Sequence, residues 1–351
     1  MNPPPRILFL ADAGPEVGGG HVMRCLTLAR ALIERGADCA FVESINATPI
    51  LRNFGWPAQT VLAMTDAPDL AALVAYAATF AEQIEADVVV VDHYGAGLAE
   101  EEALRVNGRR IVVVDDLANR QHASDLLIDP GYARRRDDYD GLTPPDCAVL
   151  VGPAHALVRP EFAGARRRAL SRRAQHAEVR RGLIALGLTD VGGVTARVVK
   201  ALINVLDDVR LDIVLTRNAP SLPILEEMAR ADRRLRLCID TSEMASLMAD
   251  ADIAIGAGGS STWERAAVGL PTATVILADN QRQMVERMAH AGLTVAVDAA
   301  DPEFETQIRL CWNALVGDSD LRWRLAERSA ELCDGNGVER VADAILRLRR
   351  A

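Results

Sequence analysis

A histidine stands directly after three glycines near the start of the chain. Gly18, Gly19 and Gly20 precede His21, between an apolar run that begins at Arg6 and a helical pattern with period 3.6. Bare glycine backbone at a helix start lets a phosphate or sugar approach unpaired N–H groups. A neutral imidazole beside the positive end of a helix can act as a base. The pattern predicts a base, His21, at an exposed helix rim; a glycine turn with a capping histidine is the alternative.

A second glycine-rich stretch lies in the other half of the chain. Gly258 and Gly259 follow an apolar run, and three hydroxyl residues and Glu264 come directly after them. Bare amides and hydroxyls at a helix start suit a diphosphate, and one carboxylate can accept hydrogen bonds from both hydroxyls of a ribose. The alternative is an ordinary helix start whose acidic residue is favoured by the helix dipole. Asn280 and Gln281 open the next helix and are expected at the same cleft.

Composition excludes several classes of function. The chain has 351 residues and a formal net charge of -10, which argues against nucleic acid as the main partner. Its six cysteines form no CxxC pair, which suits a reducing cytoplasm and no structural metal. The N-terminal residues show no leader pattern. No apolar run reaches the length of about 20 residues that a helix needs to span a membrane. Lys200 is the single lysine and follows no GxxxxG loop, which argues against P-loop and Schiff-base chemistry.

Strand and helix patterns alternate along the whole chain. Apolar runs after the first are expected as strands at 38–42, 86–91, 110–114, 125–129, 183–186, 211–216, 235–239, 252–256 and 272–276. Helices are expected at 68–84, 195–206, 321–333 and 337–348, and a loop around 54–57. Alternation of this kind predicts an α/β protein with two Rossmann-like domains facing across a cleft. The cleft is the default site.

Polar residues follow several of these strands. In an open α/β sheet, ligands bind beyond the carboxyl ends of the strands, although each such residue taken alone is more often a turn or cap residue. The residues expected to gather there in the first domain are His21, Asp92, His93, Asp115, Asp116 and His122.

The predicted domain boundaries follow the change in composition. We expect a first domain over 1–162, a connection over 163–179, and a second domain over 180–351, whose last helix either completes that domain or packs back on the first. The connection is rich in arginine, at positions 166–168, 172 and 173, and is interpreted as a solvated face; a specific anion site is the alternative.

Together these segments resemble the pseudaminic acid pathway hydrolases, the UDP-2,4-diacetamido-2,4,6-trideoxy-β-L-altropyranose hydrolases, which have a MurG-like glycosyltransferase-B fold. The resemblance covers most of the chain in the family's order. The matching segments are GGGHVMRCLTLARAL (18–32), VVDHYG (90–95), VVVDDLANRQH (112–122), DLLID (125–129), VGPAHALVRPEF (151–162) and GAGGSSTWERAAVGLP (256–271).

The resemblance implies a cytoplasmic, metal-independent hydrolase of a pathway used in flagellin glycosylation. It would release UDP and free sugar with inversion, with water and a UDP-sugar as its only reactants and no cofactor, and His21 would be the catalytic base. The implied substrate-binding residues are Asp12, Gly19, Gly20, Arg24, His93, Tyr94, Asp115, Arg159, Thr189, Asp190, Gly258, Gly259, Ser260, Ser261, Glu264, Asn280 and Gln281. The chain departs from the family pattern at Leu10, His155 and Leu188, which bears on sugar recognition more than on reaction type.

The residues suit this chemistry independently. A nucleoside diphosphate is a good leaving group, so hydrolysis needs a base for water and a cradle for negative charge. An ordinary glycosidase would show a pair of carboxylates across the bond, and the pattern indicates none. Two alternatives stay open, a UDP-sugar-dependent glycosyltransferase of the MurG type and a non-catalytic nucleotide-sugar sensor. The exact sugar, the oligomeric state and the pathway that uses the product are not fixed by the sequence.

Overall fold

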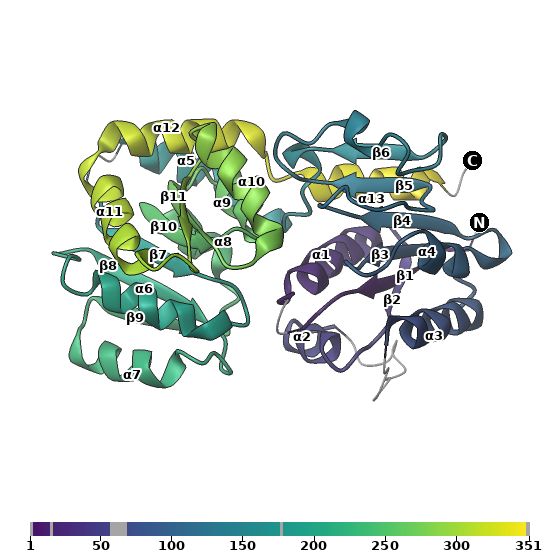
Figure 1. Ribbon diagram of the computed structural model, residues 1–351, viewed down its shortest axis with the longest axis horizontal. Helices are drawn as coiled ribbons and strands as arrows, with labels where there is room; N and C mark the ends of the chain where they lie inside the picture. Colours follow the sequence, from purple (N-terminus) through teal and green to yellow (C-terminus); the bar gives the residue numbers. More distant parts are fainter. Residues whose placement is uncertain (1–2, 15–16, 57–68, 176–177, 349–351) are drawn as a thin grey trace. The chain divides into compact units, whose positions relative to one another are not determined.

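The computed structural model describes residues 3–14, 17–56, 69–175 and 178–348. The chain forms two compact units, which Figure 1 shows as two sheets with their helices. Unit 1 comprises Met1–Leu157 and Asn336–Ala351, and unit 2 comprises Val158–Gly335. The C-terminal segment therefore belongs to the same unit as the N-terminus.

Unit 1 is built on a six-stranded sheet whose paired strands all run parallel, in the order β2-β1-β3-β4-β5-β6. The strands are β1 (Arg6–Ala11), β2 (Asp38–Phe41), β3 (Val88–Asp92), β4 (Arg110–Val114), β5 (Leu126–Asp129) and β6 (Ala148–Val151). Because β2 and β3 lie on opposite sides of β1, the connections diverge between β1 and β3. This point is the topological switch of the sheet, where open α/β folds bind ligands.

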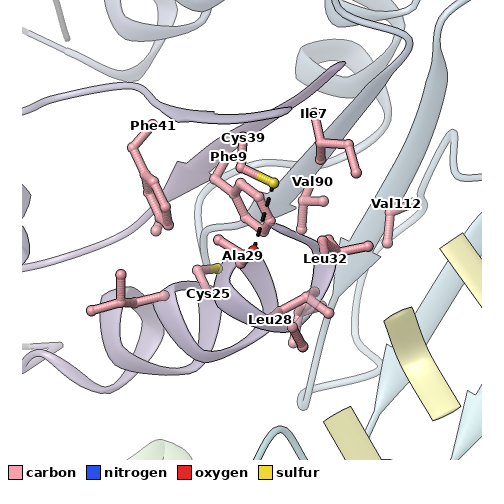
Figure 2. Packing of buried hydrophobic residues seen from close by; sticks show 14 of the residues in the cluster. Ile7, Phe9, Cys25, Leu28, Ala29, Leu32, Cys39, Phe41, Val90 and Val112 are labelled. Carbon is pink, nitrogen blue, oxygen red and sulfur yellow. Dashed lines mark hydrogen bonds between the residues drawn. The ribbon is translucent and has the colours of Figure 1, made fainter. Parts of the chain in front are cut away.

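The helices of unit 1 cover both faces of this sheet. Successive residues of a strand point to opposite faces, so Phe9 packs with α1 and α13 on one face while Leu8 packs with α3 on the other. Figure 2 shows the first of these cores, in which Phe9 stacks on Phe41 with ring centroids 4.8 Å apart. The helices are α1 (Gly20–Glu34), α2 (Ala47–Asn53), α3 (Leu70–Gln83), α4 (Leu98–Leu104) and α13 (Gly337–Leu348).

Unit 2 has a second six-stranded parallel sheet, in the order β12-β11-β10-β7-β8-β9. Its strands are β7 (Arg181–Ala185), β8 (Arg210–Leu215), β9 (Leu235–Ile239), β10 (Ile253–Ala257), β11 (Thr272–Ile276) and β12 (Val295–Asp298). Its helices are α5 (Pro160–Gln175), α6 (Val194–Leu202), α7 (Leu222–Ala231), α8 (Met244–Asp250), α9 (Ser261–Ala267), α10 (Asp279–His290), α11 (Phe304–Gly317) and α12 (Ser319–Leu332). The switch point of this sheet lies between β7 and β10.

The arginine-rich segment is mostly structural, which corrects its interpretation as a solvated face. Most of it forms α5. Arg167 and Arg168 are exposed, but Arg166 donates to the carbonyls of Ala267 and Ala330, both at 2.7 Å. Arg172 pairs with Asp252, and Arg173 donates to carbonyls near the end of α8. These half-buried guanidiniums satisfy carbonyls that the helix ends leave without an intrahelical partner.

The α/β prediction with two Rossmann-like sheets is confirmed, and the expected strands form with end shifts of one or two residues. Strands β6 and β12 and helices α2, α4 and α11 were not expected. Helix α2 is too short to show a clear period, and it ends just before the segment expected as a loop. The helix expected over 68–84 begins at Leu70; Pro68 lies outside the described residues.

Candidate functional site

The switch point of unit 1 carries the first group of candidate residues. Helix α1 begins just after the loop that follows β1, and Asp92 is the last residue of β3, in register with Ala11. The loop is closed by a β-bridge between Gly14 and Gly18, and Gly19 is the N-cap of α1. His21, in the first turn of α1, is thereby brought next to Asp92.

His21 and Asp92 form a buried pair. Nδ1 of His21 lies 2.5 Å from Oδ1 of Asp92, and the two residues are 4% and 0% exposed. A contact this short with a carboxylate oxygen assigns the Nδ1 proton to the imidazole, which leaves the Nε2 lone pair available in the neutral ring. The expectation of His21 at an exposed rim is wrong because the ring is enclosed, with Tyr94 edge-on at a centroid distance of 4.5 Å.

Arg24 binds the other side of the same carboxylate. Its Nε donates to Oδ2 of Asp92 and its NH2 group donates to Oδ1, both at 2.6 Å, while NH1 donates to Asp116 at 2.9 Å. Burial alone would raise the pKa of Asp92, but Arg24 and His21 outweigh it and hold that pKa well below its usual range. Asp92 is therefore a permanent anion beside the imidazole.

A second histidine follows β3. Nδ1 of His93 accepts a hydrogen bond from the Gly95 N–H at 3.0 Å, and its Nε2 lies 3.6 Å from Oδ1 of Asp12. Burial lowers the pKa of His93, and the Asp12 carboxylate only partly offsets this effect. The neutral ring therefore carries its proton on Nε2. Of the expected residues in unit 1, Asp12, Gly19, Gly20, Arg24, His93 and Tyr94 lie at or beside the β1 and β3 ends.

Asp115, which the resemblance assigns to substrate binding, is an internal residue. It is 1% exposed, and its carboxylate accepts hydrogen bonds from the Ala118 N–H, Arg120 and Tyr139. His122 is also buried; its Nδ1 contacts Glu101 at 2.6 Å. Asp115 and His122 are thus enclosed by other groups of unit 1, whereas Asp116, which also follows β4, accepts a hydrogen bond from Arg24 at 2.9 Å.

The switch point of unit 2 carries the glycine-rich candidates. The Gly258 N–H donates to the Val275 carbonyl, and a Cβ on Gly258 would lie 2.5 Å from Val285. A Cβ on Gly259 would meet nothing within 4 Å. Gly258 is therefore required for packing, whereas Gly259 leaves its backbone open to a ligand. Ser260 and Ser261 follow, both partly exposed.

Helix α9 holds two adjacent charged residues with different roles, Glu264 in its first turn and Arg265 in its last. Glu264 accepts a hydrogen bond from Nε of Arg159 at 2.9 Å, and both side chains keep a partly exposed surface. Arg265 is 2% exposed, and it donates to the Ala257 carbonyl at 2.7 Å and to the Ser261 hydroxyl at 3.0 Å. Burial lowers the pKa of Arg265 to about 10. It is thus still a cation at neutral pH, beneath the Gly258–Ser261 segment.

Asp190, which the resemblance also assigns to substrate binding, is an internal residue. It is 1% exposed, and its two oxygens accept the N–H groups of Thr195 and Ser221. It fixes the start of α6, while its neighbour Thr189 is only half-buried. Gln281 accepts the Leu277 N–H at 3.1 Å beside Gly258, and Asn280 is exposed.

The three departures from the family pattern lie in ordinary structural settings. Leu10 is a core residue of β1, Nδ1 of His155 donates to the Val151 carbonyl at 3.0 Å, and the Leu188 carbonyl accepts from Thr216. Within the described ranges, no group of three or more His, Cys, Asp or Glu residues could hold a metal ion, and no helix is long and apolar enough to cross a membrane.

Asp92 was expected at the strand ends, but it was not among the residues assigned to catalysis or substrate binding. The sequence does mark it as one of the polar residues after a strand, but it gives no reason to prefer it to Asp115 or Asp116. The signal that separates them is strand order, because β3 is the neighbour of β1.

Solved structures identify the class of fold. The chain superimposes on MurG of Acinetobacter baumannii with a TM-score of 0.66 at 17% identity, covering 98% of this chain and 100% of that one. A UDP-GlcNAc 2-epimerase from Neisseria meningitidis, bound to UDP-GlcNAc, gives 0.66 at 13% identity, covering 97% and 100%. The chain has the glycosyltransferase-B type of fold, as the resemblance predicts.

Sequence relatives are more specific. The chain is 25% identical over 244 residues to the UDP-2,4-diacetamido-2,4,6-trideoxy-β-L-altropyranose hydrolase of Campylobacter jejuni, covering 69% of this chain and 81% of the relative. It is 24% identical over 339 residues to the spore coat polysaccharide biosynthesis protein SpsG of Bacillus subtilis, covering 95% of each. No protein-family model matches. The match to the Campylobacter jejuni hydrolase confirms that the chain resembles these hydrolases.

Proposed function

We propose that the chain hydrolyses a UDP-linked diacetamido-trideoxy sugar at the anomeric C–O bond and releases UDP and the free sugar with inversion. The observation that carries this proposal is the buried His21–Asp92 pair at the switch point of unit 1. A histidine whose Nδ1–H is held by a carboxylate has its Nε2 lone pair in a fixed direction, which is the requirement for a general base. The relative from Campylobacter jejuni supplies the substrate class.

In the proposed reaction, Nε2 of His21 takes a proton from water as the water oxygen bonds to the anomeric carbon. The electron pair of the breaking C–O bond leaves with UDP. Asp92 stabilises the imidazolium that forms, because it remains ionised throughout. His93, Tyr94, Asp12 and the Gly19–Gly20 backbone are proposed to contact the sugar.

Unit 2 is proposed to bind the nucleotide. The open backbone of Gly259, the hydroxyls of Ser260 and Ser261, and the buried Arg265 cation suit a diphosphate. Glu264 is proposed to accept hydrogen bonds from the ribose hydroxyls, with Arg159 fixing its carboxylate. Asn280, Gln281 and Thr189 complete the proposed contacts.

Product analysis tests the proposal. The protein is incubated in water with a panel of UDP-deoxyaminosugars that includes the diacetamido-trideoxy altropyranose, with and without a chelator, and UDP and free sugar are measured. We expect equal amounts of both products, with no effect of the chelator. Turnover that appears only after an acceptor is added would instead indicate a glycosyltransferase, which the MurG-like fold also allows. Tight binding without turnover would indicate a sensor.

A further inference from the structure

Arg24 is committed to carboxylates rather than open to a ligand. Its Nε and NH2 groups bind the two oxygens of Asp92, its NH1 group binds Asp116, and the residue is 8% exposed. A guanidinium whose three nitrogens all contact carboxylates has little capacity left for a diphosphate. This geometry argues against the substrate-binding role that the resemblance implied for Arg24.

The same carboxylate oxygen serves both Arg24 and His21. Oδ1 of Asp92 lies 2.6 Å from the Arg24 NH2 group and 2.5 Å from Nδ1 of His21, and the NH2 group itself lies 3.2 Å from that Nδ1. An anion that is already neutralised by a guanidinium attracts an imidazolium less strongly than a free anion would. Asp92 can therefore orient the His21 ring while attracting an imidazolium less strongly than a free carboxylate would.

We infer that Arg24 is a positioning residue that shares the Asp92 carboxylate with His21 and thereby weakens the hold of Asp92 on the protonated imidazole. This inference deepens the proposed function and rests on it for its catalytic meaning. The pairing itself is a property of the folded protein without substrate.

Other charged and titratable groups surround the pair. Asp116, after β4, binds the outer side of Arg24, and the Cys25 thiol on α1 donates to Oδ2 of Asp92 at 3.4 Å. Tyr94 contacts the His21 ring, and His93, beside Asp12, adds a group whose charge would oppose that of His21. Among these groups Arg24 is the cation in direct contact with both Asp92 oxygens, so its removal should produce the largest change.

The test is an NMR titration of the His21 imidazole in the substrate-free protein. In Arg24→Gln, the midpoint of the His21 titration should rise by about one pH unit, because Asp92 then acts as an uncompensated anion. Arg24→Lys, which keeps a buried positive charge, should shift the midpoint of the His21 titration in the same direction by a smaller amount. This variant replaces Arg24→Gln in the titration if Arg24→Gln does not fold. In the pH profile of kcat/KM, the acidic limb should move by the same amount.

Arg35→Gln is the matched control, because Arg35 caps the other end of α1 and pairs with Glu339 and Asp343. Its His21 midpoint should equal that of the wild type. An unchanged midpoint in both Arg24 variants, with loss of UDP affinity, would overturn the inference and restore a substrate contact. A shifted midpoint in a protein that turns over no UDP-sugar would uphold the inference and refute the proposed function alone.

Discussion

Nδ1 of His21 lies 2.5 Å from Oδ1 of Asp92, across 71 residues of sequence. The contact joins the first turn of α1 to the last residue of β3 at the switch point of the sheet. Because both residues are buried, the contact fixes the tautomer and the direction of the ring before any ligand arrives.

Replacing His21 with asparagine should lower turnover by about 10²-fold or more, because asparagine supplies no base at Nε2. UDP affinity should stay within about a few-fold, since nucleotide binding is assigned to unit 2. Steady-state kinetics and calorimetry with UDP measure the two effects. His290→Asn, at the exposed end of α10, is the control. Near-normal turnover in His21→Asn would remove the base assignment.

Replacing Glu264 with alanine should raise KM more than it lowers kcat, because the ribose lies away from the reacting bond. The side chain is held by Arg159 at 2.9 Å, so Glu264→Gln tests the charge with less change in shape. Glu305→Ala is a matched control, since Glu305 also stands in a first helical turn and pairs with Arg197 at 2.7 Å. Unchanged KM and UDP affinity in Glu264→Ala would mean that the nucleotide site is elsewhere.

The bond that breaks can be read from isotope labelling. A base next to the sugar predicts that water attacks the anomeric carbon from the face opposite UDP. In ¹⁸O-water the label should then enter the free sugar and not UDP, and NMR should show the inverted anomer first. Label in the nucleotide, or UMP as a product, would show attack at phosphorus, which usually relies on metal ions.

A buried proton in unit 1 should make stability depend on pH. The Tyr139 hydroxyl lies 2.8 Å from a carboxylate oxygen of Asp115 and 2.7 Å from one of Asp129, yet it can donate to only one of them. Burial raises the pKa of Asp129 to about 6, against the opposing effect of Arg134. The folded-state pKa lies above the unfolded value, so the stability from this group is complete at low pH and is lost as the pH rises through about 6.

Asp129→Asn should remove this loss. Relative to wild type, its free energy of unfolding should increase by about 1 kcal/mol between roughly pH 5 and pH 7.5. Denaturant titrations at the two pH values measure the change. For Asp125→Asn the difference from wild type should stay constant over the same interval. Burial raises the pKa of Asp125, but hydrogen bonds from Ile111, Arg105 and Arg110 outweigh burial and lower that pKa. The Asp125 carboxyl is therefore ionised in both the folded and the unfolded state over this interval. If the difference in free energy of unfolding between Asp129→Asn and wild type were also the same at both pH values, Asp129 would not hold a proton in the folded state.

The sequence by itself determined the local features. Short apolar runs that end at glycine or polar residues need only the period of a strand and the chemistry of a turn, so nearly all strands and both glycine-rich loops could be predicted. The glycines also singled out His21 and the Gly258–Ser261 segment, because bare backbone at a helix start has a local physical meaning.

Only the tertiary structure decided which polar residues meet. Strand order sets β3 beside β1, so Asp92 reaches His21, whereas Asp115 and Asp190 turn inward to hold backbone N–H groups. The same holds for the arginines of α5, which bind carbonyls far away in sequence. Pairing between strands and the burial of charge are long-range interactions, and no local pattern of residue types specifies their partners.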